Sequence, residues 1–232
     1  MTRAYRILAA ALMLAVLASP AVTRAQQPPM TELEQAMGRR KTAPEIPPAL
    51  RPMVQEASAN RLLIRGLDGS MIEVDISEMV PADFETFGGG RFIGFMFSGY
   101  EYFGYILIDR AAQGNAAQIE TGDKPVFSPD GRHFAAVQLS GSGWGNLEGL
   151  SVWSLRPGGT TQRLFFSALP AGEDWRIDGW RRDGCIALSA APMNAEPAAP
   201  RLQFALEFGT RIGFAQTEND AACTGVVEAA NV

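Results

Sequence analysis

The side chains best suited to chemistry gather in one short stretch that reads KPVFSPDGRHF. Ser128, Asp130 and His133, which is the only histidine of the chain, fall within six residues of one another. A serine nucleophile needs a base and an orienting acid whose side chains converge, usually from distant segments. Pro129 and Gly131 instead favour a tight turn, which places His133 on the outgoing strand. The stretch therefore predicts a turn between two strands and no catalytic triad.

Other patterns of catalysis and cofactor binding are weak. A single histidine excludes the common multi-histidine zinc sites, and no metal site is predicted. In GSGWGNLEG, Asn146 stands where a dinucleotide-binding loop needs its third glycine, so no cofactor is predicted either. Carboxylates are the remaining enzymatic option, since a glycan hydrolase needs two of them about 5–10 Å apart. The acids in or beside expected loops are Glu101, Asp109, Glu148, Glu173 and Asp174.

Aromatic residues in two expected loops predict a binding surface. One loop follows the pattern SGYEYFGY at 98–105, and the other, SGSGWGNLEG, carries a tryptophan among glycines. Aromatic loop residues beside acids are common in contacts with proteins. The alternative is that the tryptophan folds back onto the core and the other rings fill space between sheets. The candidate binding residues are Tyr100, Glu101, Tyr102, Trp144, Asn146 and Glu148.

The elements that must position these loops are strands. From residue 61 onward, short apolar runs alternate with Gly, Asp and Pro, and no run shows a helical period. GLDGS at 66–70 between two such runs is typical of a hairpin. We expect residues 60–232 to form one all-β domain. A small or incomplete β-propeller-like stack of antiparallel sheets is the first expectation, and a β-sandwich is the alternative.

A weak repeat favours the propeller-like arrangement. Asp-Gly pairs at 68–69, 130–131 and 183–184 each precede an apolar run, with spacings of 62 and 53 residues. The segment PVFSPDGRHFAA at 125–136 resembles the turn between the first two strands of a blade in WD40-like β-propellers of the TolB kind, and 175–188 is a degenerate copy. The resemblance implies a propeller-like architecture. Because that family consists mostly of scaffolds and interaction modules, the resemblance implies architecture more than activity.

The first 25 residues have the features of a secretory signal. Arg3 and Arg6 precede an apolar run of twelve residues, 7–18, which is too short to span a bilayer, and small residues follow up to Ala25. Cleavage there leaves 207 of the 232 residues. We expect a soluble protein of the periplasm, or a secreted one if the cell is not Gram-negative, with no stable membrane insertion of the mature chain.

Residues 26–59 form a polar, proline-rich leader. We expect short helical pieces in it, one after Thr31 and one over 50–57, and a mobile arm is the simplest interpretation. The mature chain has 17 basic and 25 acidic side chains, a formal charge of −8. Nucleic acid binding is therefore not expected, because it requires basic surface.

Two cysteines, Cys185 and Cys223, remain after processing. An even number in an exported chain predicts a disulfide, which would close a loop of 38 residues. The first functional hypothesis is a non-enzymatic interaction module of the cell envelope with a protein partner. The alternatives are a carboxylate-dependent hydrolase or lyase acting on glycan or peptidoglycan, and a secreted inhibitor that inserts the Trp144 loop into an enzyme.

Overall fold

The computed structural model describes residues 42–100, 102–180, 185–196, 198–207 and 213–216. The chain divides into two units, residues 1–39 and 40–232, and the description concerns the second. The expected signal peptide and most of the leader lie outside the described residues. Within these ranges no helix has the length and apolar character needed to cross a membrane.

The first sheet, sheet A, has three antiparallel strands in the order β1-β2-β3. They are β1 (Val54–Ala57), β2 (Arg61–Arg65) and β3 (Met71–Asp75), preceded by the short 3₁₀ helix η2 (Pro48–Leu50). Residues 54–57, expected to be helical, form a strand because Val54 and Ala57 pack on the apolar core beside β2. The end of the leader therefore belongs to the folded body.

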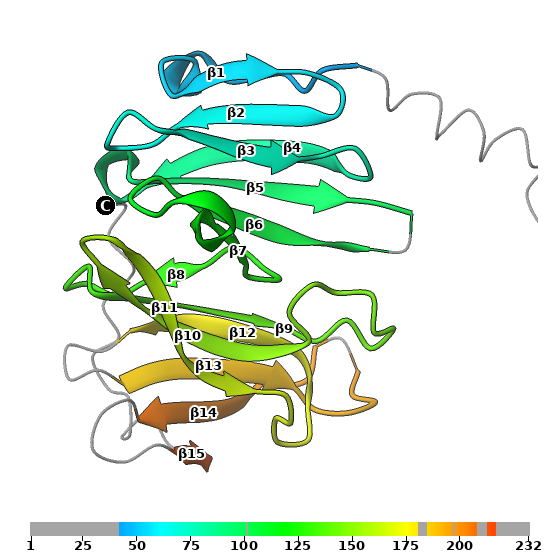
Figure 1. The fold of residues 1–232 in the computed structure, drawn as a ribbon. Coiled ribbons are helices and arrows are strands. Elements are labelled where there is room, and N and C mark those ends of the chain that lie inside the picture. Colours follow the sequence, from blue (N-terminus) through cyan, green and yellow to red (C-terminus); the bar gives the residue numbers. More distant parts are fainter. Residues whose placement is uncertain (1–41, 101, 181–184, 197, 208–212, 217–232) are drawn as a thin grey trace, which may run out of the picture. The chain divides into compact units, whose positions relative to one another are not determined.

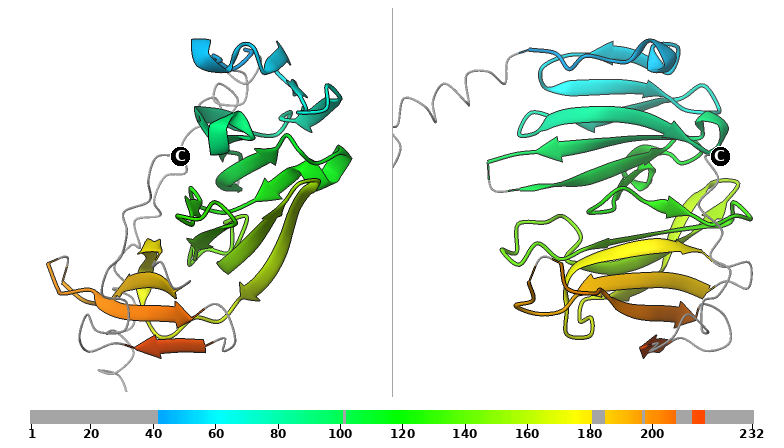
Figure 2. Two further views of the ribbon diagram at one scale, coloured as in Figure 1. Left: turned by 90° about the vertical axis from the view of Figure 1, so that its left-hand side faces the viewer. Right: turned by 180° about the vertical axis from the view of Figure 1, so that it is seen from behind.

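Three four-stranded sheets follow, each a meander of consecutive antiparallel strands. Sheet B contains β4 (Val80–Phe87), β5 (Phe92–Ser98), β6 (Phe103–Asp109) and β7 (Gln118–Glu120), with η3 (Gly88–Gly90) and η4 (Gly114–Ala117) in its connections. Sheet C contains β8 (Val126–Phe127), β9 (His133–Gln138), β10 (Gly149–Arg156) and β11 (Gly159–Phe166). Sheet D contains β12 (Glu173–Trp180), β13 (Cys185–Ala191), β14 (Leu202–Glu207) and β15 (Gly213–Gln216). In Figures 1 and 2 the sheets follow one another in chain order.

Three apolar clusters hold these sheets together, one between each neighbouring pair. Residues of β2 and β3 pack against β5 and β6, for example Ile64 against the layer that contains Phe95. A second cluster joins β5 and β6 to β9 and β10, and a third joins β9 and β10 to sheet D. Successive residues of β9 serve different clusters, since Phe134 faces sheet B and Ala135 faces sheet D. Because strand side chains alternate between faces, sheets B and C are apolar on both sides.

Sheet A differs because only one of its faces is apolar. In β2 and β3 the buried residues alternate with partly or fully exposed ones, and the exposed set includes Arg65, Met71, Glu73 and Asp75. Arg61 on this sheet forms an ion pair with Glu56 of β1 at 2.7 Å. The free face of sheet A is thus polar and charged.

The SPDG segment forms the turn between β8 and β9. Gly131 has a positive φ of 64° and donates its N–H to the carbonyl of Ser128 at 2.9 Å. The Ser128 hydroxyl donates to Asp130 at 2.7 Å and accepts the N–H of His133 at 2.9 Å. These groups are used within the turn, and the three side chains do not form a nucleophile, base and acid in series.

Of the three Asp-Gly pairs in the predicted repeat, 130–131 joins the first two strands of a four-stranded sheet, and 183–184 lies outside the described residues. The first strands of sheets B, C and D begin at residues 80, 126 and 173. In sheet B the position of the SPDG turn is occupied by Gly88–Gly90, whereas Asp68-Gly69 joins β2 to β3. The chain is therefore an all-β, propeller-like stack of four antiparallel sheets, as the strand pattern predicts.

Candidate binding site

The two loops predicted to bind lie side by side. Phe103 donates its N–H to the carbonyl of Trp144 at 3.2 Å, and its own carbonyl accepts the N–H of Asn146 at 3.1 Å. A parallel bridge between Phe103 and Gly145 results. Both loops appear on the right-hand side of Figure 1. Segment 144–146 thus continues along the edge of β6 beyond the end of β7.

Four aromatic side chains are exposed at this junction. Tyr100 is 63% exposed, Tyr102 37%, Phe103 40% and Trp144 48%. We call these four residues the aromatic rim. Trp144 does not fold back onto the core, which was the alternative for this residue. Glu101, between the two tyrosines, lies outside the described residues.

The loop that carries Trp144 is organised by one carboxylate. Glu148 accepts hydrogen bonds from the hydroxyl of Ser140 and from the N–H of Gly145, the latter at 2.9 Å. The Ser140 hydroxyl oxygen accepts the N–H groups of Gly143 at 2.9 Å and Trp144 at 3.2 Å. Glu148 itself has a positive φ of 48°. Its carboxylate, a predicted binding group, therefore positions the loop.

Close contacts at two glycines fix the loop against its neighbours. A Cβ atom at Gly145 would overlap the side-chain oxygen of Gln138, which accepts the N–H of Leu147 at 3.2 Å. A Cβ at Gly104 would overlap the side chain of Asn146. The Asn146 amide donates to a carbonyl of β6 at 3.2 Å, while its Oδ1 is buried without a hydrogen-bond partner among the described residues. Asn146, also predicted to bind, attaches the loop to sheet B.

Tyr102 connects the aromatic rim to the outer strand of sheet B. Partial burial, together with the charge and hydrogen bonding of Glu120, raises the pKa of Tyr102 to about 12. Asn146 lies beside the same phenol and has the opposite, smaller effect. The phenol is therefore a protonated donor at neutral pH, close to the carboxylate of β7.

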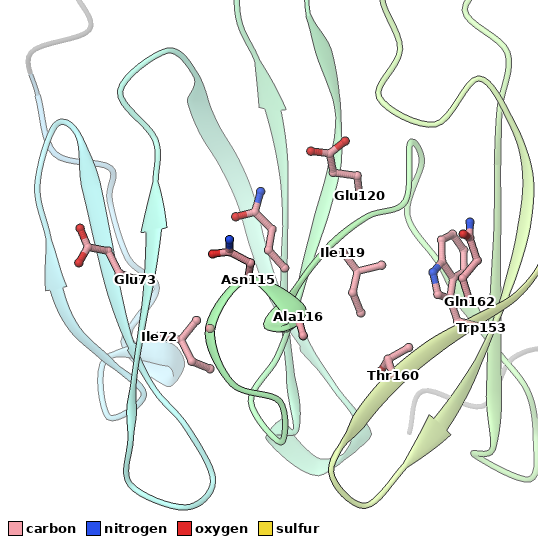
Figure 3. A pocket seen from close by; sticks show the side chains of 11 residues that line it. Ile72, Glu73, Asn115, Ala116, Ile119, Glu120, Trp153, Thr160 and Gln162 are labelled. Atoms are coloured by element: carbon pink, nitrogen blue, oxygen red, sulfur yellow. The ribbon is translucent and has the colours of Figure 1, made fainter.

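A groove of about 570 Å³ begins at Glu120 (Figure 3). It runs between β3 of sheet A, β7 with η4 of sheet B, and the β10–β11 hairpin of sheet C. Its acidic residues are Glu73 and Glu120, and no Lys, Arg or His is among the described residues that line it. The other side chains that line it are Ile72, Asn115, Ala116, Gln118, Ile119, Trp153, Thr160 and Gln162. Sequence reasoning missed this groove because its walls come from three sheets and share no motif.

Three of the five acids considered for catalysis are engaged within the fold, whereas Glu173 is exposed and Glu101 lies outside the described residues. Asp109 is fully buried and paired with Arg91, and Asp174 is paired with Arg176 and Arg201. Glu148 holds the Trp144 loop. Among the described residues, no three His, Cys, Asp or Glu side chains are grouped so that they could hold a metal ion. Cys185 is buried in β13, and Cys223 lies outside the described residues.

Comparisons with known proteins add little to this description. No family model matches the chain, and no curated protein is significantly similar to it. Among solved structures, a protein of Bacteroides fragilis assigned as a 6-phosphogluconolactonase is similar at 12% identity and a TM-score of 0.35, over 68% of this chain and 51% of that one. A Lactobacillus plantarum protein (12%, 0.33) matches over 70% of this chain and 52% of its own. Hydrazine synthase of Kuenenia stuttgartiensis (16%, 0.33) matches over 68% and 48%.

The chain thus spans about half the length of the solved structures that it resembles. At these TM-scores the architecture rests on the strand pairing of the chain itself.

Proposed function

We propose that this protein is a non-enzymatic interaction module of the cell envelope that binds a protein partner through the aromatic rim. The observation that carries the proposal is the fixed loop that presents Trp144. The ring is 48% exposed, while the backbone on both sides of it is held by Ser140 and Glu148. A loop that is already ordered loses little conformational entropy when it binds.

The composition of the rim supports a protein partner. Tyrosine and tryptophan supply large contact area with few rotatable bonds, and they are enriched at the energetic centres of protein interfaces. Tyr102 adds a hydroxyl donor at the same place. The envelope location rests on the signal-like residues 1–25.

A secreted inhibitor is the second candidate. An inhibitor loop must be exposed and must hold its own shape, and the loop around Trp144 meets both conditions. The glycan hydrolase or lyase is less favoured, because Asp109, Glu148 and Asp174 are engaged in contacts within the fold.

The experiment is site-specific photo-crosslinking in cells that export the protein. A photo-reactive residue is placed at position 144, and, as a control, at Leu67, which is 56% exposed in the β2–β3 turn. We expect a crosslinked product of defined mass only when the photo-reactive residue is at position 144. An excess of wild-type protein should suppress this product, and an excess of Trp144→Ala protein should not. Equal products at 144 and 67, or none at 144, would refute the proposal. An active enzyme inhibited in that product would favour the second candidate.

A further inference from the structure

The outer edge of β7 is open toward the groove. Sheet B is ordered β4-β5-β6-β7, so β7 pairs on one side only. Thr121 donates its N–H to the Tyr105 carbonyl at 2.9 Å. In an antiparallel ladder every second residue pair exchanges backbone hydrogen bonds, so Ile119 and Leu107 form the next bonded pair. Gln118 and Glu120 therefore direct their backbone groups away from β6.

Most of these outward groups have no partner in the described part of the chain. The Gln118 N–H bonds to the carbonyl of Asn115. No described residue bonds to the Gln118 carbonyl, or to the N–H and carbonyl of Glu120. An edge of this kind is a template for another strand, and extended peptides bind proteins by adding to it.

The charged side chains beside this edge determine which ligand charge the groove favours. Glu120 is exposed and gives the groove a negative charge, with no cation among the described residues that line it. The carboxylate of Glu73 turns instead toward the free face of sheet A (Figure 3), where Arg61 lies 3.9 Å away. Anionic ligands are disfavoured, and lysine or arginine side chains are favoured. The net charge of −5 for the whole chain acts in the same direction at long range.

Polar groups for a peptide backbone are also present. The side-chain amides of Asn115 and Gln118 make no hydrogen bond to other described residues. A sugar would instead need an open aromatic face, but Trp153 is only 5% exposed and stacks on Phe134 at 4.9 Å between ring centroids. The groove volume lies within the usual range of ligand pockets, about 300–1,000 Å³.

We propose that this groove binds an extended, basic peptide segment of a partner, which adds as a strand to the free edge of β7 and places a cationic side chain against Glu120. The proposal does not depend on Trp144, although the groove adjoins the aromatic rim where Glu120 contacts Tyr102. A strand of three to five residues would cover the length of β7, at about 3.3 Å per residue.

The test measures binding of labelled octapeptides to the full chain by fluorescence anisotropy at low and at physiological salt. One probe alternates valine with lysine and a second alternates valine with glutamate. The third probe is the lysine peptide with every second backbone nitrogen methylated. It is made in two versions, so that each set of alternate N–H groups is blocked in turn. We expect only the unmethylated lysine peptide to bind, and more weakly as salt rises.

Isosteric variants locate the site. Glu120→Gln should weaken binding by about tenfold, because it removes a charged partner. Glu73→Gln, whose carboxylate turns to the free face of sheet A, should have a smaller effect. Glu196→Gln, an exposed acid outside the groove, and Trp144→Ala should leave binding unchanged. Equal binding of the lysine and glutamate peptides, or no effect of Glu120→Gln, would overturn the proposal. Undiminished binding of the methylated peptides would overturn strand addition. A chito-oligosaccharide that binds in a Glu120-dependent way, while the lysine peptide does not, would assign the groove to glycan.

Discussion

Arg91 and Asp109 form a bidentate ion pair at the junction of sheets B and C. Arg91 Nε lies 2.9 Å from Asp109 Oδ1, and Nη2 lies 2.8 Å from Oδ2. The same Nη2 donates to the carbonyl of Arg156 at 2.7 Å, and the hydroxyl of Thr160 donates to Asp109 at 2.7 Å. One buried carboxylate thus ties β5 and β6 to the β10–β11 hairpin.

We expect Asp109→Ala to lower the free energy of unfolding by about 3–5 kcal/mol, since it leaves a partly buried guanidinium without its counter-charge. Arg91→Lys should also destabilise, because an ammonium group cannot reproduce the two parallel bonds. Urea denaturation measures both changes. The matched control is Arg176→Lys at its exposed pair with Asp174, where a change below about 1 kcal/mol is expected. A loss at Asp109 no larger than at this control would show that the buried pair does not join the sheets.

Glu148→Gln should loosen the Trp144 loop while the sheets remain intact. The carboxylate accepts bonds from Ser140 and Gly145, and an amide accepts them more weakly and adds an unneeded donor. Hydrogen exchange should therefore become faster at Gly143, Trp144 and Gly145, with little change in β9 and β10. Glu196→Gln is the control. Unchanged exchange in the loop would mean that the glycine contacts alone hold it.

Asp68 should make stability sensitive to acid. Hydrogen bonds from the hydroxyl and the N–H of Ser70, and then from Gln113, lower the pKa of Asp68 to about 2. The carboxylate of the unfolded chain titrates near its ordinary value of about 3.9. The stabilisation is therefore complete above about pH 4 and is lost as the pH falls toward 2.

The measurement is the urea midpoint between pH 2 and pH 5. In Asp68→Asn this midpoint should fall less steeply with decreasing pH than in the wild type, while Glu196→Gln should follow the wild type. Parallel pH profiles for wild type and Asp68→Asn would contradict the assignment.

Tyr102 should titrate well above an ordinary phenol. Its pKa of about 12 follows first from partial burial and second from Glu120. Absorbance at 295 nm against pH should lose a late step in Tyr102→Phe. In Glu120→Gln the same step should move toward pH 10, because the neighbouring negative charge is gone. A Tyr102 step already at pH 10 in the wild type would disprove the contact between the rim and β7.

The predicted disulfide can be tested directly. Cys185 is buried in β13, and Cys223 is its only possible partner within the chain. We expect no reactive thiol in denatured, unreduced protein and two after reduction. Replacing both cysteines with serine should cost roughly 3–4 kcal/mol in the chain-entropy model for a 38-residue loop. Two thiols before reduction would refute the prediction.

Strand content and the SPDG turn were predictable because both are local. Period-two alternation marks β3, and Pro129 with Gly131 marks the turn. The exposure of Trp144 was one of two open alternatives. The glycines around Trp144 predict a loop. The hydrogen bond from Phe103 that holds this loop outward joins two different sheets, so the local sequence does not predict it.

The groove could not be predicted for the same reason. Glu73 and Glu120 come from different sheets, and the stacking order that brings them to one groove follows from the apolar clusters. Residues 50–57 were expected to be helical because the local pattern of these eight residues contains no information on strand β2, which buries part of Val54–Ala57.

The charged free face of sheet A limits where further sheets can pack on the stack. A further four-stranded unit laid on that face would remove Arg65, Glu73 and Asp75 from water, at a cost of several kcal/mol for each ion that is left without a buried partner. Sheets B and C, apolar on both faces, can each take a neighbour on either side. A longer protein built by duplicating this unit could therefore insert sheets between A and C, but it could not extend beyond A without first replacing the surface of that sheet.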